Sequence, residues 1–170
     1  GDDVTAAITK ADEQMGIVIN NLQQYIWKRG KKTNQNPLSG ISVGTSDVKA
    51  NSSAQCISAI LNREGENVEV NTLLAEGETP VSILTSTLKK DTILNLTGAS
   101  LTEVLYYVNL GNPVYARTGD NSAVLLVGYD TANVTVFDPS KNATVKIGLN
   151  DATAKFEAAG NVFVGYITEE

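Results

Sequence analysis

The residues that could carry chemistry are few, and histidine is missing altogether. The chain of 170 residues has no histidine and one cysteine, Cys56. Histidine is the usual general base, the usual partner of a serine or cysteine nucleophile, and a common ligand of transition metals. A single cysteine also excludes an internal disulfide and a cysteine-rich metal site. We therefore expect neither a cofactor nor a bound metal.

Ser122 stands where a polar loop enters an apolar strand, in the stretch GDNSAVLLVGYD at 119–130. Five apolar residues in a row predict a strand that is buried on both faces, with Ser122 at its mouth. Many enzymes place a catalytic side chain at such a position. A serine hydroxyl, however, is a weak nucleophile unless a base activates it.

Other combinations could replace the missing base. A serine–lysine pair that uses Lys49 or Lys141 is chemically possible, although no spacing supports it. Asp130 and Asp138 could form an acid–base pair. The simpler interpretation is that Asp130 belongs to a turn and that Asp138 ends a strand before a proline.

Cys56 lies four residues before Ile60 and shares its face in a predicted helix. That face is apolar, so we expect a buried core thiol. Such a thiol is inert, because burial disfavours the thiolate.

The overall charge limits the partners. The chain has 13 Lys+Arg and 19 Asp+Glu, a net charge of −6, and its only basic cluster is Lys28, Arg29, Lys31 and Lys32. A nucleic-acid partner is not expected, because phosphate binding needs a broad positive surface.

No apolar run approaches the ~20 residues that cross a bilayer, so any membrane attachment is expected through a segment outside this sequence. The length suits one domain with a sizeable core.

The N-terminal residues 1–30 predict one long amphipathic helix. Its apolar residues recur at alternating steps of four and three, which places them on one stripe. The stripe either packs on its own domain or belongs to a coiled coil. Polar residues 31–40 predict a linker, and the compact domain is expected over 41–170. The stripe consists of Val4, Ile8, Ala11, Met15, Val18, Leu22 and Tyr25.

Within 41–170, helical patterns come first and strand patterns later, which predicts an α+β fold. Ser52 is expected to cap the first helix of this domain. Helices are predicted over 52–62, 70–75, 80–88, 101–110 and 150–159, and strands over 114–117, 122–129, 134–137, 143–147 and 162–167.

Four stretches, AILNREG at 59–65, SLTEVLYYVNLGNPVYART at 100–118, SAVLLVGYD at 122–130 and VTVFDP at 134–139, together resemble a known family. In order and spacing they are similar to papain-like cysteine peptidases of the double-glycine-leader, bacteriocin-processing type. The resemblance implies a papain-like fold, with a helical N-terminal half packed on an antiparallel sheet. It covers about 41–167 and leaves the predicted N-terminal helix outside.

The resemblance also implies where catalytic residues would stand. Counting back from Asn62, the nucleophilic cysteine position falls on Ser52, and the usual Gly-Pro after it is Ser53-Ala54. The histidine position is Ser122, and Asp138 matches the residue that orients the imidazole. The glutamine that helps to hold the oxyanion has no counterpart in 41–51. Ser52, Ser122 and Asp138 are thus expected to be vestigial site positions that converge on one cleft, with no functional catalytic residue.

These features predict a catalytically inactive homologue of a cysteine peptidase. Its expected role is to bind a peptide or a protein segment in the vestigial cleft. Two alternatives stay open: a residual peptidase that uses unrecognised residues, and an assembly domain that works through the N-terminal helix. The resemblance also implies an extracellular or cell-surface location in a Gram-positive bacterium, as a fragment of a longer secreted or membrane-anchored protein. The sequence carries no signal for an oligomeric state.

Overall fold

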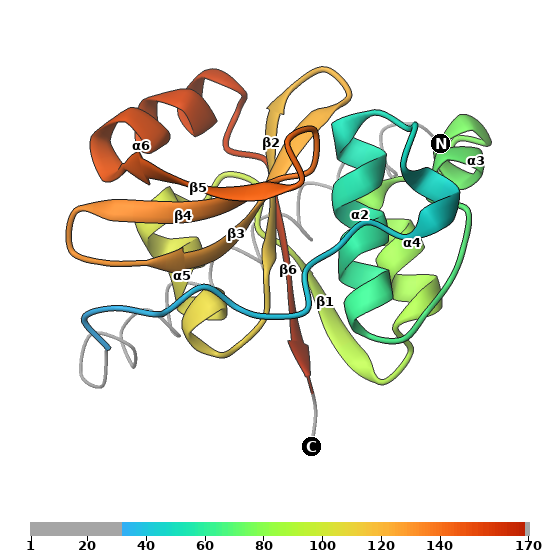
Figure 1. Cartoon of the computed structure of the whole chain (residues 1–170), viewed down its shortest axis with the longest axis horizontal. Coiled ribbons are helices and arrows are strands. Elements are labelled where there is room, and N and C mark those ends of the chain that lie inside the picture. Colours follow the sequence, from blue (N-terminus) through green and yellow to red (C-terminus); the bar gives the residue numbers. More distant parts are fainter. Residues whose placement is uncertain (1–31, 169–170) are drawn as a thin grey trace, which may run out of the picture.

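The computed structural model describes residues 32–168, so the helix predicted over 1–30 lies outside the described residues. The described chain is α+β, with helices and strands in the order shown in Figure 1. The helices are η1 (Thr45–Asp47), α2 (Ser52–Arg63), α3 (Val70–Ala75), α4 (Pro80–Thr87), α5 (Leu101–Asn109) and α6 (Leu149–Ala158). The strands are β1 (Asp91–Asn95), β2 (Val114–Gly119), β3 (Ser122–Tyr129), β4 (Asn133–Asp138), β5 (Ala143–Gly148) and β6 (Phe163–Thr168).

The described strands form one sheet in the order β1-β6-β2-β3-β4-β5, and every pairing is antiparallel. Consecutive strands β2 to β5 form a meander, whereas β6 returns to lie between β1 and β2. The last described strand, β6, therefore pairs with β1, the strand that directly follows helices α2 to α4.

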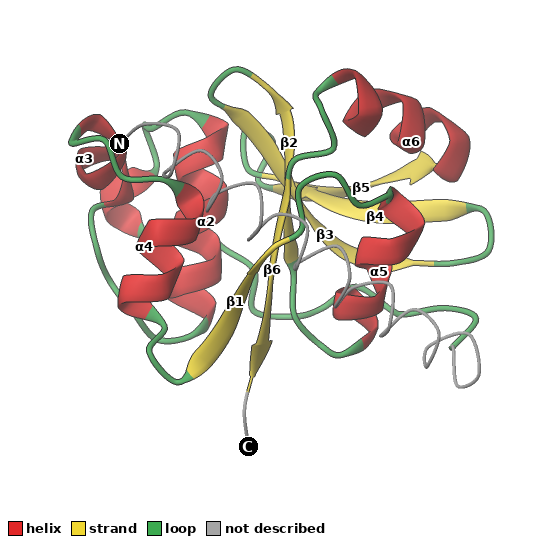
Figure 2. Ribbon diagram, turned by 180° about the vertical axis from the view of Figure 1, so that it is seen from behind, coloured by secondary structure: helices red, strands yellow, loops and turns green. Residues whose placement is uncertain are grey.

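Helices cover the sheet on two sides, and Figure 2 shows α2, α3 and α4 apart from α5 and α6. Side chains alternate along β3, so Ala123, Leu125 and Val127 join the core beneath α2 and α4. Val124 and Leu126 join the other core, beneath α5 and α6. This double burial explains the unbroken apolar run that the sequence displays.

The first turns of two helices are closed by side chains. Thr79 and Ser82 form a reciprocal capping box at α4, with Pro80 in the first turn. Ser100 and Glu103 form the same arrangement at α5. These helices therefore begin at the residues predicted from the sequence, at Pro80 and Leu101.

Two details differ from the sequence prediction. The N-cap of α2 is Asn51, whose side chain accepts a hydrogen bond from the Ala54 amide, and Ser52 is the first helical residue. Strand β1 was not predicted, since Asp91–Asn95 has only two apolar residues in succession. Its position comes from long-range pairing with β6.

Residues 32–40, from the segment predicted as a linker, lie against the sheet. Gln35 exchanges backbone hydrogen bonds with Tyr129 at 2.8 and 3.0 Å, and the Leu38 amide donates to Val127. Gly128 lies between these contacts and has no side chain, which lets the segment approach closely: a Cβ there would lie 2.9 Å from the Gln35 carbonyl oxygen.

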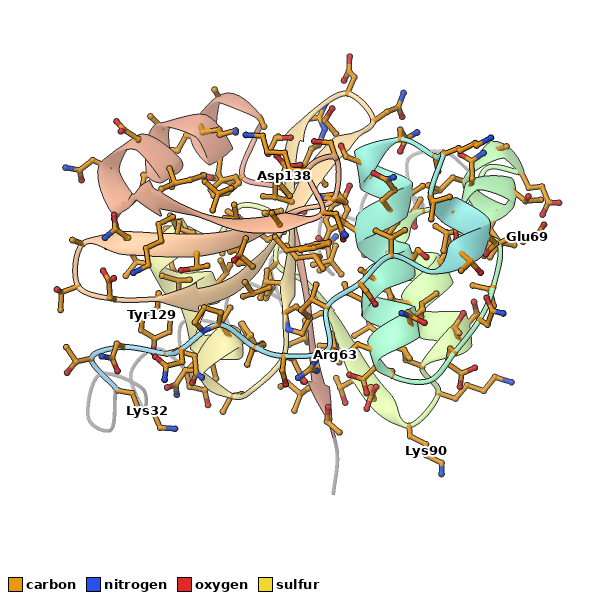
Figure 3. The ribbon with its side chains drawn as sticks, in the orientation of Figure 1. Lys32, Arg63, Glu69, Lys90, Tyr129 and Asp138 are labelled. Carbon is orange, nitrogen blue, oxygen red and sulfur yellow. The ribbon has the colours of Figure 1, made fainter. Side chains whose placement is uncertain are left out.

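Arg63, labelled in Figure 3, is the last residue of α2. Its guanidinium donates to the carbonyls of Ser39 and Gly111, and it forms an ion pair with Glu64. Glu64 in turn accepts a hydrogen bond from the buried Tyr166 hydroxyl on β6 at 2.7 Å. These contacts fix the helical part relative to β6.

Candidate functional site

The N-terminus of α2 meets the β2–β3 hairpin. The Ser52 hydroxyl oxygen accepts a hydrogen bond from the Ala123 amide at 3.1 Å. The Ser53 amide donates to the Asn121 carbonyl at 3.3 Å. The predicted packing of this helix against 123–127 is confirmed, and Ser52 lies next to the peptide bond that joins Ser122 to Ala123.

Ser53 makes the next contact along the helix. Its hydroxyl lies 2.7 Å from the Tyr115 hydroxyl, and both side chains are buried. Burial raises the pKa of Tyr115, and this outweighs the opposing effects of the Ser53 hydrogen bond and the Arg117 charge. Tyr115 therefore stays protonated near neutral pH and cannot serve as a base toward Ser53.

Asp138 ends β4, and its carboxylate accepts hydrogen bonds from the Ser140 amide and hydroxyl, at 3.0 and 2.6 Å. The same carboxylate lies close enough to Cys56 for its negative charge to affect the thiol. The structure thus brings Ser52 to the start of β3. Convergence of Ser52, Ser122 and Asp138 on one cleft stays a prediction.

Cys56 is fully buried, as the sequence predicted. Burial, and to a lesser extent the Asp138 carboxylate, raises the pKa of its thiol well above the usual value.

We expect native protein to resist alkylation at Cys56 near neutral pH, because the thiolate is the reactive form and both effects disfavour it. The measurement is the stoichiometry of iodoacetamide labelling by mass spectrometry, before and after unfolding in urea. Rapid labelling of one thiol per folded chain would contradict the expected inertness.

A groove of about 540 Å³ opens beside the start of α2. Its lining comes from α2, α3, α4, strands β1, β2 and β6 and the β2–β3 turn, so both the helical part and the sheet contribute. Asn51, Ser53 and Asn121, the neighbours of Ser52 and Ser122, lie on its wall together with Tyr115 and Arg117. Apolar surface is supplied by Leu74, Pro80, Val81, Val162 and Val164.

Arg117 is held in place at the groove. It donates to the Ala159 carbonyl at 2.8 Å and forms an ion pair with Asp120 at 2.7 Å. Both bonds join β2 to neighbouring loops. The guanidinium is therefore held in a fixed position at the groove wall, with its charge paired to Asp120.

The carboxylate pair considered from the sequence does not form. Asp130 accepts hydrogen bonds from the amides of Ala132 and Asn133, in the turn that precedes β4. Asp138 ends the same strand, and Figure 3 shows it far from Tyr129, the neighbour of Asp130. The two carboxylates are separated by the length of β4 and cannot act on one substrate bond.

Sequence reasoning missed Ser53, Tyr115 and Arg117 as residues of this site. Ser53 and Tyr115 are 62 positions apart, and a strand pattern does not reveal which hydroxyl a tyrosine will meet.

Within residues 32–168, no three His, Cys, Asp or Glu side chains gather closely enough to hold a metal ion. In the same range, no helix combines the length and apolar character needed to span a bilayer.

Asn51→Ala should lower the free energy of unfolding by about 1 kcal/mol, since it removes the side-chain acceptor at the N-cap of α2. Asn51→Ser should restore most of the loss, because serine is an equally good cap. Urea denaturation of the three proteins measures both changes. Equal midpoints for all three would show that the cap contributes nothing.

Comparison with known proteins supports the fold. No protein-family model and no curated protein matches this chain. A crystal structure from Bacillus anthracis, described provisionally as a C39-like peptidase, superposes with a TM-score of 0.61 and 17% sequence identity. The match covers 75% of this chain and 98% of the other. At this identity the likeness concerns the fold alone. The described residues therefore have the α+β fold of a papain-like, C39-like peptidase. The order of helical and strand patterns predicted the α+β class, and the resemblance implied the papain-like fold.

Proposed function

We propose that this chain is a catalytically inactive relative of the C39-like peptidases, and that it binds a peptide or a protein segment in the groove beside α2. The observation that carries the proposal is the groove itself. It opens beside the N-terminus of α2, and both parts of the fold line it. Residues adjacent to Ser52 and Ser122 belong to its wall, whereas Ser52, Ser122 and Asp138 do not. The peptide-binding surface is proposed to be retained although the catalytic cysteine and histidine are absent.

Three features support inactivity. No histidine is present to act as a base. The Ser52 hydroxyl oxygen is engaged by the Ala123 amide, and the Ser53 amide is engaged by the Asn121 carbonyl. The raised pKa of Tyr115 keeps the nearest hydroxyl partner of Ser53 protonated. Among residues 32–168, the Ser52 hydroxyl meets the Ala123 amide and the Ser53 hydroxyl meets the Tyr115 hydroxyl, and neither partner is suited to take a proton.

The walls of the groove suit an extended peptide. Apolar side chains such as Leu74, Val81 and Val162 can contact peptide side chains, whereas Asn51 and Asn121 offer amide groups to a peptide backbone. The expected setting is outside the cell or at the surface of a Gram-positive bacterium. That setting rests on the resemblance in the sequence.

Titration with peptides that end in Gly-Gly tests the proposal. We expect saturable changes in amide NMR signals at Asn51, Ser53 and Asn121, with the peptide recovered intact. Leu74→Lys should weaken binding at least tenfold, since it places a charge on an apolar wall. Leu110→Lys is the matched control, because Leu110 is exposed and does not line the groove.

Each outcome separates the alternatives. Shifts that do not saturate, or equal affinities for both lysine variants, would reject a peptide-binding groove. Cleaved peptide would support the residual peptidase instead. In that case Ser52→Ala and Ser53→Ala would show which hydroxyl is needed.

A further inference from the structure

A second groove, of about 360 Å³, lies away from the α2 site. The nearly buried Leu105 and Tyr129 and the partly exposed Leu149 line it from α5, β3 and α6. Thr102 and Asp130 add polar groups to its wall. The site thus combines an apolar surface with a partly polar wall, and the proposed peptide-binding groove shares none of these residues.

The first described residues, Lys32 and Thr33, lie at the edge of this groove. The Tyr129 hydroxyl donates to the Lys32 carbonyl at 3.2 Å, and Thr33 is part of the groove wall. Residues 1–31 come directly before this point. Any segment formed by those residues is therefore tethered at the edge of the groove.

The sequence of residues 1–31 provides an apolar stripe that needs a partner. Leu22 and Tyr25 are the members of the stripe nearest to Lys32. Thr33 follows Tyr25 by eight residues. Eight residues span about 12 Å as a helix and at most about 26–29 Å when extended, so these side chains are within reach of the groove.

Opposite charges also favour a position of residues 1–31 at this groove. Lys28, Arg29, Lys31 and Lys32 form the basic cluster between the stripe and the groove. The exposed Asp151 lines an adjoining hollow with Leu149, and Asp130, which also faces Lys146 at 3.9 Å, lies in the groove wall. Opposite charges at the tethered end reduce the number of orientations in which the segment can dock.

We propose that residues 1–31 dock in this groove of their own chain, with Leu22 and Tyr25 against the surface formed by Leu105, Tyr129 and Leu149. The tether makes docking intramolecular, so it does not depend on protein concentration. The stripe is thereby used to cover the domain and is not available for a coiled coil. This proposal is independent of peptide binding at the α2 groove.

Thiol labelling tests the proposal in the full chain. All proteins carry Cys56→Ala, and Leu149→Cys places one reporter thiol in the groove. Leu22→Asp should speed labelling of that thiol at least tenfold, because a carboxylate cannot remain against an apolar surface. Asn20→Asp is the matched control, since it adds the same charge on the opposite face of the predicted helix and should leave the rate unchanged.

A second reporter guards against a local folding defect. Thr131→Cys, at an exposed position in the groove wall, should show the same pattern. Thr85→Cys, exposed on α4, should label at one rate in all backgrounds. Equal rates at position 149 with and without Leu22→Asp would overturn the proposal. Protection that fades on dilution would also overturn it, because a second copy would then be the occupant.

Discussion

Gly128→Ala should lower the free energy of unfolding by about 1–3 kcal/mol, a large effect for one methyl group. A Cβ at this position would lie 2.9 Å from the Gln35 carbonyl oxygen and 3.1 Å from both N and Cα of Pro37. All three are backbone atoms, so no side-chain rotation relieves the clash. The segment around Gln35 must move away, and its paired hydrogen bonds with Tyr129 are weakened.

Gly119→Ala is the matched control. Its added Cβ would be 3.9 Å from the Ser122 Cβ, which is an ordinary contact distance. Urea denaturation should therefore give a lower midpoint for Gly128→Ala than for Gly119→Ala. Equal midpoints would mean that the segment before Leu38 is not held against β3.

The helices and strands could largely be predicted because their side-chain patterns are local. The bounds of α3 and β3 agree with the sequence prediction. For β3, the apolar run is long and turn residues bound it on both sides. Strand β1 was not predictable in this way, since its pairing with β6 depends on residues more than 60 positions away.

The site was predictable only in part. The resemblance placed Ser52 beside the start of β3, and the hydrogen bond from Ala123 agrees with that placement. Asn51, Ser52 and Ser53 are all good capping residues, so propensity alone could not select Asn51 as the N-cap. The bond between Ser53 and Tyr115 depends on how α2 packs on β2, which no local pattern records.

The second prediction with a large effect is that a reactive thiol can be restored by changes at Ser52 and Ser122. In a Cys56→Ala background, Ser52→Cys places a thiol at the first residue of α2, where the helix dipole favours an anion. Adding Ser122→His places an imidazole one residue before Ala123, whose amide now meets the Ser52 hydroxyl. An imidazolium there should lower the pKa of the thiol further.

The size of the effect follows from the thiolate fraction. An ordinary thiol with a pKa of about 8.5 is roughly 0.3% thiolate at pH 6, whereas a pKa of about 6 makes it about half thiolate. Lower basicity reduces the reactivity of each thiolate by about one order of magnitude. Relative to an ordinary thiol, the double variant should therefore label about tenfold faster at pH 6. Relative to Ser52→Cys alone the increase should be smaller, several-fold, because the helix N-terminus already lowers the pKa of that thiol. Peptide cleavage is not expected, since the missing oxyanion donor is worth ~2.7–4 kcal/mol.

A matched histidine separates proximity from a general effect of the added charge. Ser52→Cys with Thr131→His carries the same residues, but position 131 follows the opposite end of β3 from Ser122. This protein should label like Ser52→Cys alone. Thermal unfolding of each variant establishes that the compared proteins are folded.

The most direct test of a disabled peptidase site is the pH profile of iodoacetamide labelling in these three variants. The account predicts that the midpoint of the profile moves to lower pH only when the histidine is at position 122. Superimposable profiles for Ser52→Cys with and without Ser122→His would contradict it, because positions 52 and 122 would then not face each other.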